Sequence, residues 1–236
     1  MNSVKIIFVV IQLAGLCCWS SAYAQSKNPD EILDRVKETF SGVEDYRVNV
    51  HIKVDVDFLK VPESDATVYF KQPDKIYVES EKFALLPKRS LNLLSLSILN
   101  GKHTALYVAE DTIRNVITSV VKVIPLGSES DIVLSTLWID TRRNIIMKIE
   151  STAKPSGTFT IDFFYNNTYS GYNLPDSLIF TFTIDRMRFP KGMNGTFDSD
   201  EKDNEKEPGR TTGKVYLSYS DYRINQGLPD SIFKQK

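Results

Sequence analysis

Cysteine is nearly absent from this chain of 236 residues: it has two, Cys17 and Cys18, both near the N-terminus. Beyond them the sequence allows no disulfide, no thiol nucleophile and no cysteine-containing metal site. Histidine is as scarce, because the chain has only His51 and His103, and neither has a partner at metal-ligand spacing. We therefore expect neither a metal site nor a cofactor.

An excess of positive charge and the usual catalytic motifs are missing as well. The formal net charge is −1, whereas a nucleic-acid-binding domain is basic, so nucleic acid is not an expected partner. The sequence has no G-x-S-x-G, no phosphate-binding glycine loop and no H-E-x-x-H. Triads assemble in space, which leaves a hydrolase as an alternative, but no residue stands out as catalytic and we expect a protein that is not an enzyme.

One long hydrophobic run, Ile6 to Leu16, is broken only by Gln12 and follows the basic Lys5. Ala22-Tyr23-Ala24 then matches an A-x-A cleavage site, so residues 1–24 are interpreted as a cleaved signal peptide. A transmembrane anchor is the first alternative, and the run is short for one. A lipoprotein signal is the second, but no small residue precedes Cys17 or Cys18.

The most regular pattern in the rest of the chain is a strict alternation from Tyr46 to Phe58, apolar at even positions and polar at odd ones. This period predicts a strand with one buried and one solvated face, and therefore an antiparallel sheet. At about 3.3 Å per residue the strand would be roughly 40 Å long. The pattern leaves open what covers its apolar face.

An amphipathic helix is predicted directly before this strand. Asn28 can cap the helix, Pro29 suits its first position, and Gly42 is a natural stop. Its apolar side consists of Ile32, Leu33, Val36 and Phe40. The helix either packs on the sheet as part of the core or forms a lid over the apolar face.

Nine further segments have the composition or alternation of strands and are separated by turn signals. They are residues 65–71, 75–81, 103–109, 116–124, 132–140, 145–152, 158–165, 178–186 and 213–224. About ten antiparallel strands in one domain curl or close into a barrel. The fold class is therefore mainly β.

Two connecting segments differ from these strands. Phe83 to Leu99 is rich in leucine without a clean period, and we expect a loop with helical turns that plugs one end of the sheet. Lys191 to Arg210 is polar and lacks EF-hand spacing, so we expect a disordered acidic loop. Residues 25–236 are expected to form one domain that contains both segments.

Large apolar side chains share one face on several predicted strands, including Phe159, Ile161 and Phe163 on one and Phe180 and Phe182 on another. Burial is favourable by about 25 cal/mol per Å², so an open face of this size would attract a ligand, a lid or a neighbour. The alternative is a barrel that these side chains fill completely.

The order of these pieces resembles the LolA/LolB superfamily of lipoprotein carriers, and most closely the outer-membrane lipoprotein-sorting proteins. The resemblance covers the helix and first strand from Asp30 to Val56, and the strand, proline turn and return strand from Val68 to Val78. It continues in Leu137-Trp138-Ile139-Asp140, Ile146-Met147-Lys148-Ile149 and Thr160-Ile161-Asp162-Phe163.

This resemblance implies an unclosed, strongly curved β-barrel with a helical lid over a hydrophobic cavity. The lid would present Ile32, Leu33, Val36 and Phe40. Carried over by position, the cavity wall would contain Val48, Val50, Val68, Phe70, Ile76 and Val78. The apolar faces of the predicted strands add Ile52, Val54, Phe159, Ile161, Phe163, Phe180 and Phe182 to the expected wall. The carriers have an arginine before the proline of the turn, which is thought to latch the lid, but this chain has Gln72 there.

The function that the resemblance implies is that of a carrier or chaperone in the periplasm of a Gram-negative bacterium. It would bind the acyl chains of lipoproteins or other lipids and ferry them toward the outer membrane. The implied partners are this cargo, an inner-membrane release complex and an outer-membrane receptor, and we expect a monomer. The alternative is an RseB-like envelope-stress regulator of the same fold, but such regulators have a second domain, for which we expect no room.

Overall fold

The computed structural model describes residues 27–56, 61–80, 99, 101–126, 131–154, 157–166, 171–185 and 210–234. The predicted signal peptide, the predicted plug except Leu99 and the predicted acidic loop except Arg210 therefore lie outside the described residues. Leu99, the last residue of the predicted plug, is buried in the core of the sheet.

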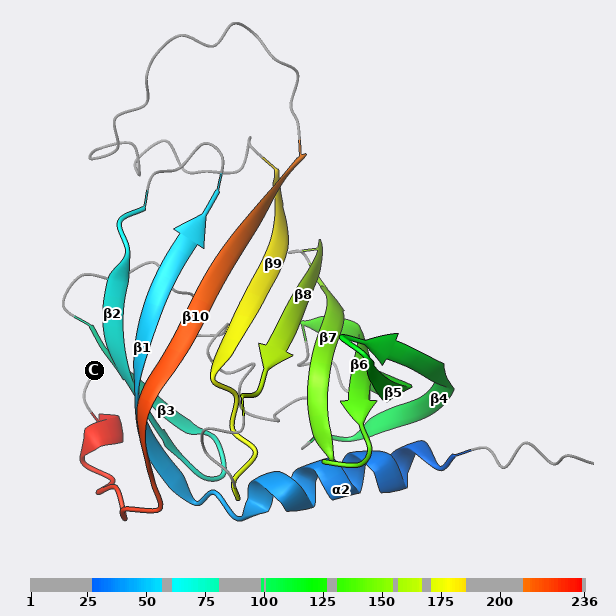
Figure 1. Cartoon of the computed structure of the whole chain (residues 1–236), viewed down its shortest axis with the longest axis horizontal. Coiled ribbons are helices and arrows are strands. Elements are labelled where there is room, and N and C mark those ends of the chain that lie inside the picture. The colour runs from blue at the N-terminus through cyan, green and yellow to red at the C-terminus, as the bar shows by residue number, and fades with distance from the viewer. Residues whose placement is uncertain are drawn as a thin grey trace, which may run out of the picture.

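One antiparallel sheet contains all ten strands of the described residues, in the order β3-β2-β1-β10-β9-β8-β7-β6-β5-β4. The sheet curves strongly, as Figure 1 shows. Its edges, β3 and β4, do not pair with each other, so the predicted unclosed barrel is confirmed. The strands are β1 (Asp45–Asp55), β2 (Ser64–Lys71), β3 (Lys75–Glu79), β4 (His103–Ile113), β5 (Val116–Pro125), β6 (Ile132–Asp140), β7 (Ile145–Ala153), β8 (Gly157–Phe164), β9 (Ser177–Asp185) and β10 (Arg210–Ile224).

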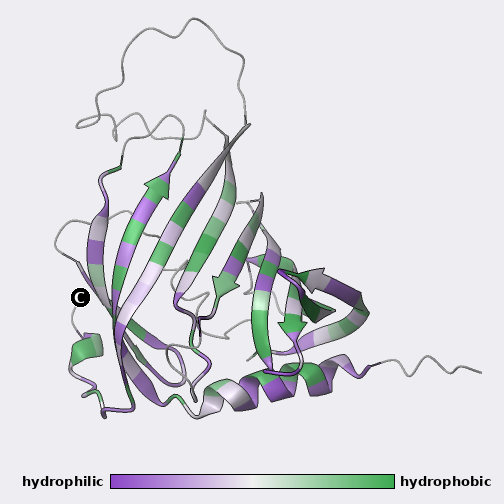
Figure 2. Cartoon of the chain, in the orientation of Figure 1, coloured by the Kyte–Doolittle hydropathy of each residue, from purple (hydrophilic) through white to green (hydrophobic). Residues whose placement is uncertain are grey.

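The alternation of β1 has the two faces that the sequence predicts. Val48, Val50 and Ile52 are at most 2% exposed, whereas His51 and Lys53 on the other face are exposed. Neighbouring strands continue the buried face, because Val48 lies opposite Val68 of β2 and Val50 lies opposite Tyr219 of β10. Figure 2 shows hydrophilic and hydrophobic bands alternating along the strands.

The predicted helix is present as α2 (Pro29–Ser41) and lies across one end of the curved sheet (Figure 1). Asn28 caps it, since its side chain accepts a hydrogen bond from the backbone N–H of Asp30 at 3.1 Å. Ile32, Leu33 and Val36 are buried against the sheet. Gly42 has a φ of −70°, so the helix ends there without the left-handed glycine conformation that often follows a helix.

Two details of the strands differ from the sequence prediction. β4 continues beyond Ala109 to Ile113 and joins β5 through Arg114 and Asn115, which both have positive φ. The two central residues of such a hairpin turn are usually Asn, Asp or Gly. Because the first of them is Arg114 here, the sequence carries no clear signal for this turn. β10 begins at Arg210 and contains a bulge opposite the segment from Arg47 to Asn49.

Candidate functional site

The concave side of the sheet is lined by one continuous apolar cluster. All predicted wall and lid residues belong to it. Those that are buried are Ile32, Leu33, Val36, Val48, Val50, Ile52, Val68, Phe70, Ile161 and Phe163, and those that are partly buried against them are Phe40, Val54, Ile76, Val78, Phe159, Phe180 and Phe182.

The strand register explains how residues distant in the sequence meet on this face. Leu217 of β10 lies opposite Ile52 on one side and Leu178 on the other. Farther along the sheet, Ile161 of β8 lies between Phe180 of β9 and Ile149 of β7. Because opposite residues of an antiparallel pair point to the same face, the apolar surface crosses the sheet without a gap.

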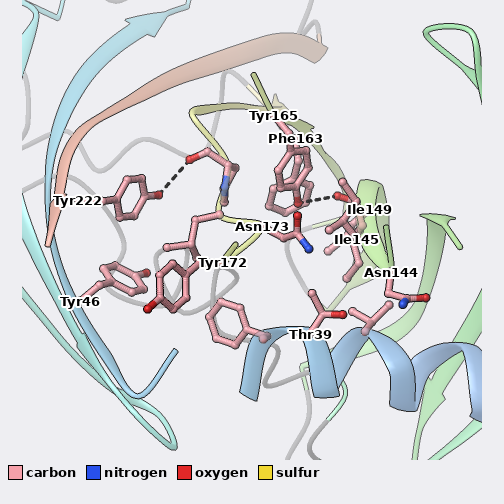
Figure 3. Close-up of a pocket in the computed structure, with 15 residues that line it drawn as sticks. Thr39, Tyr46, Asn144, Ile145, Ile149, Phe163, Tyr165, Tyr172, Asn173 and Tyr222 are labelled. Carbon is pink, nitrogen blue, oxygen red and sulfur yellow. Dashed lines mark hydrogen bonds between the residues drawn. The ribbon is translucent and has the colours of Figure 1, made fainter. Parts of the chain in front are cut away.

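An open cleft lies at the end of this surface, between the C-terminal half of α2 and the sheet (Figure 3). It holds about 660 Å³ of space without atoms, including the part open to solvent. Its lining comes from α2, the start of β1, the turn from β6 to β7, the first half of β7, the ends of β8 and β10, and the connection from β8 to β9. These residues are Val36, Thr39, Phe40, Tyr46, Asn144, Ile145, Ile146, Ile149, Phe163, Tyr165, Tyr172, Asn173, Leu174, Pro175 and Tyr222.

Only Val36, Phe40 and Phe163 of the predicted site residues line this cleft. The others belong to the apolar cluster outside the cleft, and six of them are only partly buried. The open cleft therefore covers only a small part of the predicted cavity wall, and it lies next to the helix. Tyr46, Ile149 and Tyr165 lie within predicted strands, whose pattern could have placed them in the site. The connection from Tyr172 to Pro175 has no periodicity that could have revealed its role.

The cleft combines apolar walls with hydroxyl and amide groups, and none of its lining side chains is charged. Tyr165 donates a hydrogen bond to the carbonyl of Ile146 at 2.9 Å, and Tyr222 donates one to the carbonyl of Pro175 at 3.0 Å. Burial raises the pKa of both Tyr46 and Tyr165 above the ordinary value, so both phenols are neutral. The lining can bind an apolar or uncharged group, but it offers no ionised nucleophile or base.

Aromatic rings join the end of α2 to the first strands. Phe40 contacts Phe70 with ring centroids 5.8 Å apart, and Tyr46 stacks on Phe70 at 5.0 Å. Tyr222 of β10 meets Tyr46 edge-on at 5.6 Å. Aromatic pairs with such geometries stabilise beyond their buried area. These rings hold the wall of the cleft on the side of β1.

The side chain of Gln72 fastens the C-terminal end of α2. Its Nε2 donates hydrogen bonds to the carbonyls of Ser41 at 3.1 Å and Val43 at 2.8 Å. The last carbonyls of a helix lack partners within the helix, so these bonds satisfy groups that would otherwise need water. At the other end of the helix, Lys27 forms an ion pair with Glu110 of β4 at 2.6 Å.

A buried carboxylate at the same end of the barrel organises the segment after β10. Asp45 is 3% exposed and accepts hydrogen bonds from the backbone N–H groups of Gln226, Gly227 and Leu228 at 3.0–3.1 Å. A carboxylate that receives several backbone N–H groups is strongly stabilised in place. Asp45 lies between the predicted helix and the predicted strand that begins at Tyr46, so the sequence pattern does not reveal this role.

On the convex side, His51 lies between two carboxylates. Its Nδ1 is 2.9 Å from Asp65 and its Nε2 is 3.1 Å from Glu63. These hydrogen bonds raise the pKa of His51 above its ordinary value and lower the pKa of Glu63. Within the described ranges, no group of three or more His, Cys, Asp or Glu side chains is arranged to hold a metal ion. No helix in that part of the chain is long and apolar enough to cross a membrane.

Comparison with known proteins gives matches in structure only. The sequence matches no protein-family model, and no curated protein matches it. A DUF1329 family protein from Desulfovibrio piger has a TM-score of 0.60 at 12% identity and covers 87% of this chain and 95% of its own. A LolA superfamily protein from Nitrosomonas europaea has a TM-score of 0.55 at 14% identity, with coverages of 88% and 97%.

A third solved structure, described as a putative outer membrane lipoprotein-sorting protein domain from Vibrio parahaemolyticus, has a TM-score of 0.53 at 14% identity. It covers 87% of this chain and 96% of its own. The resemblance that the sequence showed is thus confirmed at the level of the fold. The chain has the fold of the LolA superfamily.

Proposed function

We propose that the chain is a periplasmic carrier that binds the acyl chains of lipoproteins or other lipids between α2 and the concave face of the sheet, without a covalent step. The observation that carries this proposal is the cleft, where an uncharged, aromatic-rich lining opens onto a continuous apolar surface. A hydrocarbon chain could leave the cleft along this surface without meeting a charged lining group.

The concave face is already packed with apolar side chains, so cargo needs space there. An acyl chain could take the place of the apolar side chains of α2 on this face. Ile32, Leu33 and Val36 are buried, and each contributes about 1.5–3 kcal/mol when it leaves water. An acyl chain gains about 0.8 kcal/mol per buried CH₂ group. A long chain therefore replaces the contacts of the helix with contacts of similar strength, and binding stays reversible.

Filling the cleft tests this proposal without placing a charge in the core. Thr39 lines the cleft from α2, so Thr39→Trp should occupy the open space and lower the affinity for a fluorescent fatty-acid probe by at least tenfold. Glu38→Trp adds the same side chain at an exposed position of the same turn and should bind the probe as the unmodified protein does. Equal probe affinity in both variants, with unchanged circular dichroism, would contradict the proposed site.

A further inference from the structure

Two buried hydroxyl groups on the concave face have no hydrogen-bond partner. Among the residues that the structure describes, Oγ of Ser64 and Oη of Tyr219 are the buried side-chain oxygen or nitrogen atoms for which none is found. Both residues are 7% exposed. A buried polar group without a partner is costly, so each such group calls for an explanation.

The two hydroxyl groups belong to one patch of the sheet. Ser64 of β2 lies opposite Ile52 of β1, and Tyr219 of β10 lies opposite Val50 of the same strand. Ser64 and Tyr219 thus flank β1 on the buried face, on strands roughly 10 Å apart. A guest that runs along β1 would pass both.

A bulge in β10 keeps two tyrosines on this face. Asp221 has a φ of 53° at the irregularity of the β1–β10 register, where one extra residue is inserted. As a result Tyr219 and Tyr222 both point to the concave side, with ring centroids 6.0 Å apart. Tyr222 lines the cleft and has its own partner, the carbonyl of Pro175. Tyr219 lies directly beside this wall with its hydroxyl group unused.

The unused hydroxyl of Tyr219 is a donor. Burial raises its pKa well above the ordinary value, and the nearby Tyr46 raises it further, so the phenol keeps its proton. Tyr46 itself lines the cleft, and Figure 3 shows its ring extending from β1 toward the cleft interior. A pure hydrocarbon guest would leave the Tyr219 donor unsatisfied, whereas a guest with a carbonyl oxygen would satisfy it.

We infer that Tyr219 donates a hydrogen bond to the ester carbonyl of a bound acylglycerol, so that the protein selects ester-linked acyl chains over plain hydrocarbon. This inference rests on the proposed lipid-binding function and adds the chemical class of the cargo. The apolar cluster holds the chain, and the hydroxyl group recognises the point where the chain joins its glycerol.

A pair of ligands that differ only in this carbonyl tests the inference. Monopalmitoylglycerol has an ester and hexadecylglycerol an ether at the same position, and each competes against a fluorescent fatty-acid probe. The unmodified protein should bind the ester about three- to tenfold more tightly than the ether, the range expected for one net hydrogen bond.

Tyr219→Phe removes the hydroxyl group and keeps the ring. This variant should bind the two ligands equally and should melt at the same or a higher temperature, because an unsatisfied polar group is gone. Tyr216→Phe, on the opposite face of the same strand, should keep the preference for the ester. Both a diacylglyceryl-cysteine peptide and dipalmitoylphosphatidylglycerol carry the ester, so Tyr219→Phe should weaken both, and the tighter of the two identifies the source of the ester.

The outcomes separate this inference from the function on which it rests. Ester and ether bound equally by the unmodified protein would overturn the inference and leave the carrier function standing, with a buried water as the partner of Tyr219. A preference for the ester that survives in Tyr219→Phe would overturn it too. Failure of both ligands to displace the probe, or no binding of the probe, would overturn the carrier function and the inference together.

Discussion

Gln72 holds Ser41 across the boundary between sheet and helix: Nε2 of Gln72 donates a hydrogen bond to the carbonyl oxygen of Ser41 at 3.1 Å. The same amide reaches the carbonyl of Val43 at 2.8 Å. The turn after β2 is thereby tied to the last residue of α2. In the proposed mechanism α2 moves when cargo binds, and this amide is then a latch between the two parts.

Replacing Gln72 by alanine should therefore loosen α2 without disturbing the sheet. Loss of the hydrogen bonds to the carbonyls of Ser41, at the end of the helix, and Val43, just beyond it, should cost about 1 kcal/mol, because water replaces the amide in part. Hydrogen exchange of the α2 amides should accelerate and an acyl probe should bind faster. Gln226→Ala, which removes an exposed amide bonded to Ile224, is the matched control and should change neither. Unchanged exchange in Gln72→Ala would show that the amide is no latch.

Asp45 should be a strong determinant of stability. Asp45→Asn replaces an acceptor oxygen with a donor that faces backbone N–H groups, so the free energy of unfolding should fall by about 2–3 kcal/mol. Urea denaturation measures this difference. Asp55→Asn changes an exposed carboxylate on the same strand and should leave the midpoint nearly unchanged. A decrease of less than about 0.5 kcal/mol, the lower end of the range for one net hydrogen bond, would contradict the anchoring role of Asp45.

The pair of carboxylates around His51 should make stability depend on pH. The pKa of His51 is raised in the folded state, so its stabilising effect is fully present below its ordinary pKa of 6.5 and is lost as the pH rises through the raised value. The stability difference between the unmodified protein and His51→Gln should therefore be larger at acidic than at alkaline pH. NMR titration of the ring should show the raised pKa, and Asp65→Asn should lower it. A His51 pKa unaffected by Asp65→Asn would refute this coupling.

Gly213 marks a place where β10 has no room for a side chain. A Cβ atom there would lie 2.8 Å from Cζ of Phe182 and 3.0 Å from Cγ2 of Val56. Gly213→Ala should cost about 1–3 kcal/mol, the range for overpacking a filled core. Gly101→Ala has open space around the new methyl group and is the control. If the ring of Phe182 is the obstacle, adding Phe182→Leu to Gly213→Ala should restore part of the lost stability. If the two substitutions lower the stability additively, the ring of Phe182 is not the obstacle.

The sequence predicted elements whose periodicity is strong. The strict alternation from Tyr46 onward and the capped, one-sided pattern after Asn28 correspond to β1 and α2, because one face of each must be buried. The apolar cluster followed from the same alternation, since every predicted wall residue lies in it. Such local patterns predict the structure well because folding buries the apolar face that the pattern defines.

The open part of the site was harder to predict, because it depends on contacts between distant segments. Tyr172, Asn173 and Pro175 reach the cleft from a connection with no repeating pattern. Gln72 bonds to a carbonyl 31 positions away, and Asp45 bonds to N–H groups more than 180 positions away. Each of these contacts involves a single polar side chain and distant backbone groups, so it produces no periodic pattern in the sequence.

The central claim is that the concave face binds acyl lipid. Mass spectrometry of the lipids bound to purified protein that lacks residues 1–24 tests it most directly. Native spectra should show a bound species, and solvent extracts should yield acyl lipid close to one equivalent per chain, falling sharply in Thr39→Trp but not in Glu38→Trp. Protein that carries no lipid, and takes up none when mixed with acylglycerol or diacylglyceryl peptide, would contradict the account.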